Sequence, residues 1–285
     1  MTYVELFRWG RDNLRNAGME EADLDARLLL EYVCGTSRSD LLAHGDRAVD
    51  VEKQTSYEAL IKRRKERVPL QHLTGVQEFM GLNFLVNEHV LIPRQDTEIL
   101  VEEALKNLHD GMRILDMCTG SGCILISLLH YTNDCEGVGV DISGDALEVA
   151  QKNAEQLCGR SIRKHSFLQS DLFEKVTGKF DVIVSNPPYI CSQIIGTLMP
   201  EVREHEPIGA LDGGEDGLFF YRRIVGESRE HLYGGGMLFF EIGYDQAGAV
   251  RNLMEQAGFL EVNVVKDYAG LDRIVYGTLG FDGAL

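Results

Sequence analysis

Asn186, Pro187, Pro188 and Tyr189 form the segment with the most specific chemistry. They follow a predicted apolar strand at 180–185, and the two prolines make a rigid loop whose carbonyl oxygens have no neighbouring N–H. An amide –NH2 presents two hydrogens, so methylation of its nitrogen needs acceptors for both. Asn186 Oδ1 and the Pro187 carbonyl can supply them, and Tyr189 can pack on the planar group. We predict a catalytic and substrate-binding loop for methylation of a planar nitrogen; a structural proline turn is the alternative.

A glycine-rich turn follows a predicted strand at 112–117 and opens a helix. Glycines let the backbone approach a ligand closely at the carboxyl end of a sheet. A dinucleotide fingerprint would need Gly or Ala where this chain has Leu125. The turn predicts a nucleoside-cofactor site, with a tight turn that binds no ligand as the alternative. Its candidate cofactor contacts are Asp116, Cys118, Thr119, Gly120, Ser121 and Gly122.

Two acidic residues stand at the ends of the next two predicted strands. Asp141 lies 19 positions after Gly122, where a carboxylate can accept hydrogen bonds from both ribose hydroxyls. Asp171 is followed by Leu172, a pair that suits an adenine amine and its ring face. These features fit either NAD or S-adenosylmethionine. The alternatives are a helix-capping Asp141 and a turn residue at Asp171.

These candidate residues need a scaffold, and the patterning predicts one. Residues 1–75 show only helical patterns, residues 76–93 predict a β-hairpin linker, and helices alternate with strands over 94–285. Such alternation predicts an α/β fold with a mainly parallel sheet covered by helices on both faces. Asp96 or Thr97 is expected to cap the first of these helices.

The composition limits the classes of partner that the protein is expected to bind. The net charge is −17, from 45 acids and 28 bases, which argues against a broad DNA-binding face. The basic run 62–65 is interpreted as a solvated helix face. The six cysteines form no C-x-x-C pair, so we expect buried free thiols and no metal site. Neither a signal peptide nor a membrane span is apparent, and the expected compartment is the cytoplasm.

The order of these motifs resembles class I S-adenosylmethionine methyltransferases that act on planar nitrogens. More narrowly, it resembles the HemK/PrmC family, which methylates the N5 amide of the glutamine in the Gly-Gly-Gln loop of bacterial peptide chain release factors. Segments along nearly the whole chain carry the resemblance: 69–71 with Gly75, 92–94 with 97–98, 206–221, 241–243 with Gln246, and 267–273. Cys118, His72 and Gln95 depart from the family pattern, which usually has Gly, Tyr and Pro there.

The resemblance implies a seven-stranded Rossmann-like methyltransferase domain with a reversed C-terminal hairpin. It implies S-adenosylmethionine as cofactor, with S-adenosylhomocysteine as product, lined by 118–122, Asp141, Asp171, Leu172 and Asn186. It also implies that 186–189 hold the substrate glutamine and that the N-terminal helices help to bind the release factor. The expected protein is a monomer whose partners are class 1 release factors, without DNA or membrane.

Three other functions remain open on the sequence. An N6-adenine DNA methyltransferase shares the chemistry of the Asn186 loop, although the acidic balance disfavours it. A dehydrogenase shares the glycine turn and the acid at 141. A non-catalytic S-adenosylmethionine-binding module would keep the fold without the acceptor groups.

Overall fold

A computed structural model describes residues 1–157 and 164–281. The chain divides into two compact units, which are described separately. The first contains Met1–Val76 with Met199–His205, and the second contains Gln77–Leu198 with Glu206–Leu285. Cys158, one of the expected free thiols, lies outside the described residues. Within those residues, no helix combines the length and apolarity that a bilayer span requires.

The first unit is helical, as the sequence predicts. Its first helix begins with a capping box, in which Thr2 and Glu5 bond each other's backbone N–H. The apolar faces meet in a core that includes Leu6, Leu29 and Tyr57, each 0% exposed. The helices are α1 (Tyr3–Asn16), α2 (Ala22–Cys34), α3 (Arg38–Ala43), α4 (Val51–Lys65), α5 (Leu70–Thr74) and α10 (Pro200–His205).

A buried ion-pair cluster lies inside this unit, and it corrects the interpretation of the basic run 62–65 as wholly solvated. Arg64 is only 9% exposed. Its Nε donates to Asp25 Oδ2 at 2.8 Å, and its Nη1 donates to Glu201 Oε1 at 3.2 Å. A guanidinium can be buried here because two carboxylates receive its hydrogens.

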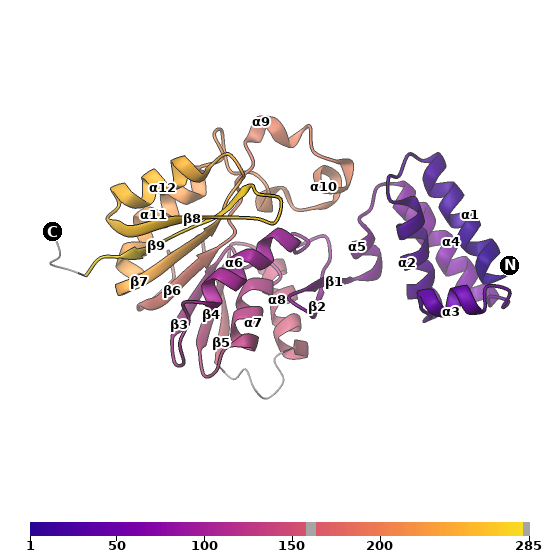
Figure 1. The fold of residues 1–285 in the computed structure, drawn as a ribbon, viewed down its shortest axis with the longest axis horizontal. Helices are drawn as coiled ribbons and strands as arrows, with labels where there is room; N and C mark the ends of the chain where they lie inside the picture. Colours follow the sequence, from indigo (N-terminus) through magenta and orange to yellow (C-terminus); the bar gives the residue numbers. More distant parts are fainter. Residues whose placement is uncertain (158–163, 282–285) are drawn as a thin grey trace. The chain divides into compact units, whose positions relative to one another are not determined.

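The second unit contains the predicted seven-stranded sheet (Figure 1). Strands run in the order β5-β4-β3-β6-β7-β9-β8, parallel from β5 to β7 and antiparallel at β7-β9-β8. The reversed C-terminal hairpin is therefore present. The strands are β3 (Arg113–Met117), β4 (Glu136–Asp141), β5 (His165–Gln169), β6 (Phe180–Ser185), β7 (Leu232–Glu241), β8 (Phe259–Lys266) and β9 (Asp272–Leu279).

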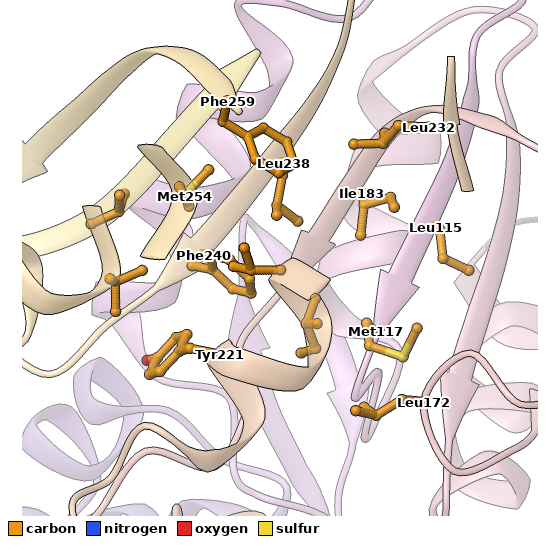
Figure 2. Packing of buried hydrophobic residues seen from close by; sticks show 14 of the residues in the cluster. Leu115, Met117, Leu172, Ile183, Tyr221, Leu232, Leu238, Phe240, Met254 and Phe259 are labelled. Atoms are coloured by element: carbon orange, nitrogen blue, oxygen red, sulfur yellow. The ribbon is translucent and has the colours of Figure 1, made fainter. Parts of the chain in front are cut away.

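Helices cover both faces of this sheet (Figure 1). One buried cluster joins α6 (Gln95–Leu105), α7 (Cys123–Tyr131) and α8 (Gly144–Leu157) to β3 and β6. The other joins α11 (Phe219–His231) and α12 (Ala247–Gln256) to the opposite face, where Tyr221, Phe240 and Met254 pack together (Figure 2). Two buried apolar layers explain why the central strands are apolar on both sides.

The connections differ from the sequence-based expectations in two places. The predicted hairpin is present as β1 (Val76–Phe79) and β2 (Leu82–Leu85). The helices α9 (Ser192–Ile195) and α10 and the 3₁₀ turn Ile208–Ala210 were not predicted. Neither Asp96 nor Thr97 caps α6, since the helix already begins at Gln95 with Arg94 as its N-cap. The Thr97 hydroxyl instead accepts a hydrogen bond from Asn186.

The expectation of buried thiols holds for only part of the cysteines. Cys34, Cys123 and Cys135 are buried, whereas Cys118 and Cys191 are half-exposed. Both of these lie on connections that follow strands, where packing is less complete than in the two core layers. In the described chain, no cluster of His, Cys, Asp or Glu has the geometry to hold a metal ion.

The strand order brings the two main motifs together. From β3 the chain builds outward through β4 and β5, then returns to β6 on the other side of β3. Met117 pairs with Ser185 in the register of these two strands. The glycine turn and Asn186 therefore leave adjacent strand ends, at the kind of switch point where α/β sheets bind ligands.

Candidate active site

A cavity of about 330 Å³ opens at the carboxyl ends of β3, β4, β5 and β6. Its volume lies within the usual range for small-molecule sites. All the residues that line it belong to the second unit. The predicted site residues among them are Cys118, Thr119, Gly120, Ser121, Asp141, Asp171, Leu172, Asn186 and Pro188.

Asp116, Gly122, Pro187 and Tyr189 were also predicted, but they do not line this cavity. Gly122 lies at a helix crossing, where an added Cβ would be 3.2 Å from Ala150 Cβ. Asp116 is 0% exposed and lies under the glycine turn; its Oδ2 accepts from the Thr119 hydroxyl at 2.5 Å and from Leu125 N at 3.3 Å. Burial raises the pKa of Asp116 to about 7. Its contacts hold the turn in shape rather than reach into the cavity.

Gly120 and Asp141 face each other across the cavity wall. Gly120 N donates to Asp141 Oδ2 at 2.8 Å, and Ser143 N donates to Oδ1 at 3.0 Å. Burial raises the pKa of Asp141. Each carboxylate oxygen keeps a further lone pair for a ribose hydroxyl. Gly120 has φ +54°, and a Cβ added there would meet no atom within 4 Å, so the turn leaves open space for a ligand.

Asp171 and Leu172 lie on the neighbouring wall, after β5. Leu172 is only 4% exposed, with its side chain among the residues that pack against α11 and α12 (Figure 2). Asp171 Oδ1 accepts from Arg223 Nη1 at 2.8 Å, which leaves Oδ2 available for a donor in the cavity. A carboxylate beside an apolar surface suits an adenine ring with an exocyclic amine.

The Asn186 side chain has a defined orientation. Asn186 Nδ2 donates to Thr97 Oγ1 at 3.3 Å, while Oδ1 receives no hydrogen bond from any described residue. The carbonyl oxygens of Pro187 and Pro188 likewise receive none within the described chain. The loop thus keeps its acceptors unpaired, which is the arrangement that binding an –NH2 group requires.

Gln246 and the loop 213–217, called the glycine loop below, support the segment 186–189 on the side away from the cavity. Gln246 Nε2 donates to the carbonyl oxygens of Tyr189 and Gly217, at 3.0 and 3.2 Å, and its Oε1 accepts from Gly243 N at 2.9 Å. A Cβ added at Gly213 would lie 2.7 Å from Tyr189 Cα. The glycine loop and the segment therefore pack backbone against backbone.

Glu241 lies at the end of β7 and is only 2% exposed. The Tyr189 hydroxyl donates to its Oε1 at 3.3 Å. Burial raises the pKa of Glu241 to about 7, although hydrogen bonding by Thr97 and the charge of Arg273 oppose the shift. Burial likewise raises the pKa of Tyr189, and the neighbouring carboxyl group adds to that shift.

Comparison with known proteins identifies the family to which the chain belongs. The chain is 41% identical to the release factor glutamine methyltransferase of Geobacter sulfurreducens, with 98% of this chain and 97% of the relative covered. The chain belongs to the release factor glutamine methyltransferase family. The Escherichia coli K12 member is 39% identical, with 96% and 99% covered. Residues 5–75 match the PrmC N-terminal domain and residues 94–197 the methyltransferase small domain.

Solved structures show the same fold at lower identity. A methyltransferase from Pyrococcus furiosus is 18% identical with a TM-score of 0.54, covering 80% of this chain and 100% of that one. A 16S rRNA N2 G1207 methyltransferase from Thermus thermophilus, in complex with AdoMet and guanosine, is 19% identical with a TM-score of 0.50, covering 72% and 49%. The Rossmann-like methyltransferase fold expected from the sequence is confirmed.

One departure from the family pattern has a structural explanation. Cys118 has φ +62°, a conformation that favours glycine, the residue usual in this family at that position. Burial raises the pKa of the Cys118 thiol, and the charges of Asp141 and Asp116 add to the shift. The thiol therefore stays protonated and makes this wall of the cavity apolar.

The sequence predicted no role at the site for several residues that the structure places there. Thr97, Glu241 and Gln246 lie in segments that carry the family resemblance, but no local pattern links them to the Asn186 loop 52 to 89 positions away. Arg94 lines the cavity, and its Nη2 donates at 2.6 Å to the buried Glu206 Oε1. Only the folded chain reveals such pairs.

Proposed function

We propose that this protein transfers a methyl group from S-adenosylmethionine to the N5 amide nitrogen of the glutamine in the Gly-Gly-Gln motif of bacterial class 1 release factors. The observation that carries the proposal is the Asn186 loop beside a nucleoside-sized cavity, in which Asn186 Oδ1 and the Pro187 carbonyl oxygen receive no hydrogen bond from the described residues. Family membership supports the choice of a glutamine amide over an adenine amine.

S-adenosylmethionine would supply an electrophilic methyl group on a sulfonium. The amide nitrogen forms the new N–C bond, the electron pair of the broken S–C bond stays on sulfur, and one amide hydrogen leaves as a proton to water. Asn186 Oδ1 and the Pro187 carbonyl accept the two N–H groups and hold the nitrogen in line with the methyl. The same acceptors stabilise the positive charge that develops on nitrogen. Tyr189 packs on the planar amide.

The cavity offers a distinct place for each part of the cofactor. Asp141 takes the ribose hydroxyls, while Asp171 and Leu172 take the adenine amine and ring. The glycine turn with Gly120 leaves room for the methionine part. The first unit binds the release factor, and the protein works as a cytoplasmic monomer on an acceptor protein, without DNA.

Mass spectrometry tests the proposal. Release factor and duplex DNA are incubated separately with the enzyme and S-adenosylmethionine, and the Gly-Gly-Gln peptide is examined for a single methyl group. We expect methyl glutamine and unmodified DNA. DNA as the better acceptor, or an unmodified peptide, would overturn the proposal.

Asn186→Ala removes the acceptor while leaving the rest of the loop. We expect methyl transfer to fall at least about 100-fold, as when a preorganised catalytic hydrogen-bonding group is lost, with cofactor affinity changed less than threefold. Asn263→Ala is the matched control, because that asparagine is exposed on β8 and its Nδ2 donates to the nearby Glu261 carbonyl. Unchanged turnover in Asn186→Ala would refute the role of the loop.

A further inference from the structure

A buried set of polar side chains lies behind the Asn186 loop, and the transfer chemistry described above does not use it. Thr97 is on α6 and Glu241 ends β7, and each is 2% exposed. Thr97 Oγ1 accepts from Asn186 Nδ2, and Glu241 Oε1 accepts from the Tyr189 hydroxyl, both at 3.3 Å. Each end of the loop therefore bonds to one of these two buried side chains.

The Thr97 hydroxyl connects the two halves of this set. Its hydrogen bonding with Glu241 lowers the pKa of that carboxyl group and opposes the effect of burial. Among the described residues no other group receives the Thr97 hydrogen. Glu241 Oε2 is buried and has no hydrogen-bond partner in the same part of the chain, so the carboxyl group still has a vacant acceptor for the Thr97 hydroxyl.

The direction of these hydrogen bonds follows from what each group can do. An ionised carboxylate only accepts, so the Thr97 hydroxyl must point its single hydrogen toward Glu241. The Thr97 oxygen is then only an acceptor on its other side. It must therefore face the –NH2 of Asn186 rather than the amide oxygen, and this turns Oδ1 toward the cavity.

The reverse direction would defeat binding of an amide. If Thr97 donated its hydrogen to Asn186, the amide would turn by about half a rotation about its last bond. Its –NH2 would then face the two N–H groups of the substrate, and donors do not hydrogen-bond donors. The orientation of one side chain thus decides whether the loop accepts the substrate.

We propose that Glu241, acting through Thr97, fixes the Asn186 amide with Oδ1 facing the substrate, and that its contact with the Tyr189 hydroxyl fixes the other end of the same loop. Glu241 and Thr97 are positioning residues, since neither touches the reacting nitrogen. The inference rests on the proposed methylation of a glutamine amide.

The groups that face Glu241 determine its charge near neutral pH. Burial and the charge of Asp96 favour the protonated form of Glu241, whereas Arg273 favours the ionised form, and the pKa of the carboxyl group is raised to about 7. The ionised form is the one that can only accept. Turnover should therefore rise with pH through about 7. Several elements pack around Glu241. The polar and titratable side chains that face it from these elements are Asp96, Thr97, Cys123, Tyr189, Tyr221 and Arg273.

Kinetics of four variants on the full chain with a release factor test this inference. We expect Glu241→Gln and Thr97→Val each to lower kcat about 10- to 100-fold, as when a buried hydrogen-bond partner is lost. The Kd for the cofactor should stay within about twofold of the wild-type value. Thr97→Ser keeps the hydroxyl and should stay within about threefold of the wild type. Glu241→Gln should also lose the rise of kcat with pH.

Tyr221→Phe is the structural control. The Tyr221 hydroxyl donates at 2.8 Å to the backbone oxygen of Glu241, so the variant loses a buried bond to the same residue without touching its carboxyl group. We expect lower thermal stability with kcat unchanged. A kcat in Tyr221→Phe as low as in Glu241→Gln would show a merely structural effect and overturn the inference.

The side-chain amide resonances of Asn186 provide a readout that needs no turnover. In ¹⁵N spectra they should titrate near pH 7 in the wild type and stop titrating in Glu241→Gln and Thr97→Val. A wild type that methylates no release factor but shows this titration would refute the proposed function and leave the inference standing. An active wild type with flat resonances, or with kcat unchanged in both variants, would refute the inference.

Discussion

Replacing Gly213 with alanine should show how much of the activity depends on the backbone behind the Asn186 loop. A Cβ built on Gly213 lies 2.7 Å from Tyr189 Cα, 2.8 Å from Tyr189 C and 2.9 Å from the Pro188 oxygen. All three atoms are backbone, so no side chain can rotate away. Gly213 does not have a positive φ, and the effect is therefore purely steric.

The size of the effect follows from these distances. The contact to Tyr189 Cα falls about 0.7 Å short of the 3.4 Å at which ordinary van der Waals contact begins. Relief requires the loop to move by much of that distance, and a displacement near 1 Å at a reacting group costs about 100-fold in rate. We expect kcat to fall about 10- to 100-fold. Overpacking of this kind should cost about 1–3 kcal/mol of unfolding free energy.

The assay combines turnover on a release factor with urea unfolding monitored by circular dichroism. Gly226→Ala is the control, because that glycine is exposed within α11 and an added Cβ meets nothing within 4 Å. Alanine in a helix interior should raise stability by about 0.5–1 kcal/mol and leave kcat unchanged. If Gly213→Ala matched this control in both measurements, the close packing behind the loop would be disproved.

Three further changes test other parts of the structure. Asp141→Ala should weaken S-adenosylmethionine binding about 10-fold or more by calorimetry, because a buried carboxylate that would accept from ribose is lost; a change under threefold contradicts that role. Asp25→Ala takes one partner from the buried Arg64 and should cost about 2–3 kcal/mol in chemical unfolding, whereas the exposed Asp23→Ala should cost under about 0.5 kcal/mol. Because the pKa of Glu241 is raised to about 7 by burial, the folded state binds the extra proton and loses stability as pH rises from about 4.5 to above 7. Glu241→Gln should therefore gain about 3 kcal/mol relative to the wild type between pH 5 and 8, and a constant difference would contradict the buried carboxyl.

The parts of the site that the sequence predicts are those attached to strand ends. Asp141 and Asn186 can be recognised in the sequence because each ends an apolar run, and a buried strand has few polar residues until it leaves the sheet. Asp171 follows the edge strand β5, which is less apolar, and was recognised from its pairing with Leu172. Parallel strands place their carboxyl ends along one edge, so these side chains meet in one cavity. The mainly parallel sheet followed from the alternation of helices and strands, and the seven strands that the family resemblance implied are confirmed.

The parts that the sequence does not predict are contacts made across long separations. Thr97 looks like a helix cap, since a threonine before an apolar run normally bonds its own helix backbone. Its hydroxyl instead meets Asn186, 89 positions away. No periodicity in the sequence indicates which partner the Thr97 hydroxyl takes, because the partner depends on how α6 packs beside β6 and β7. The same holds for Gln246, whose partners Tyr189 and Gly217 lie on two other loops.

The two prolines explain why so many distant groups converge on this loop. Pro187 and Pro188 have no N–H, so the middle of the segment cannot be fixed by donating backbone hydrogen bonds. The Pro187 carbonyl oxygen must also stay unpaired if it is to receive a substrate amide. The hydrogen bonds that hold the loop then come from groups that point away from the cavity. Those groups are the Asn186 –NH2, the Tyr189 carbonyl and the Tyr189 hydroxyl, and each has a buried partner from another element. A loop that offers free acceptors to a substrate therefore needs a rigid support behind it, and Glu241, Thr97 and Gln246 provide that support.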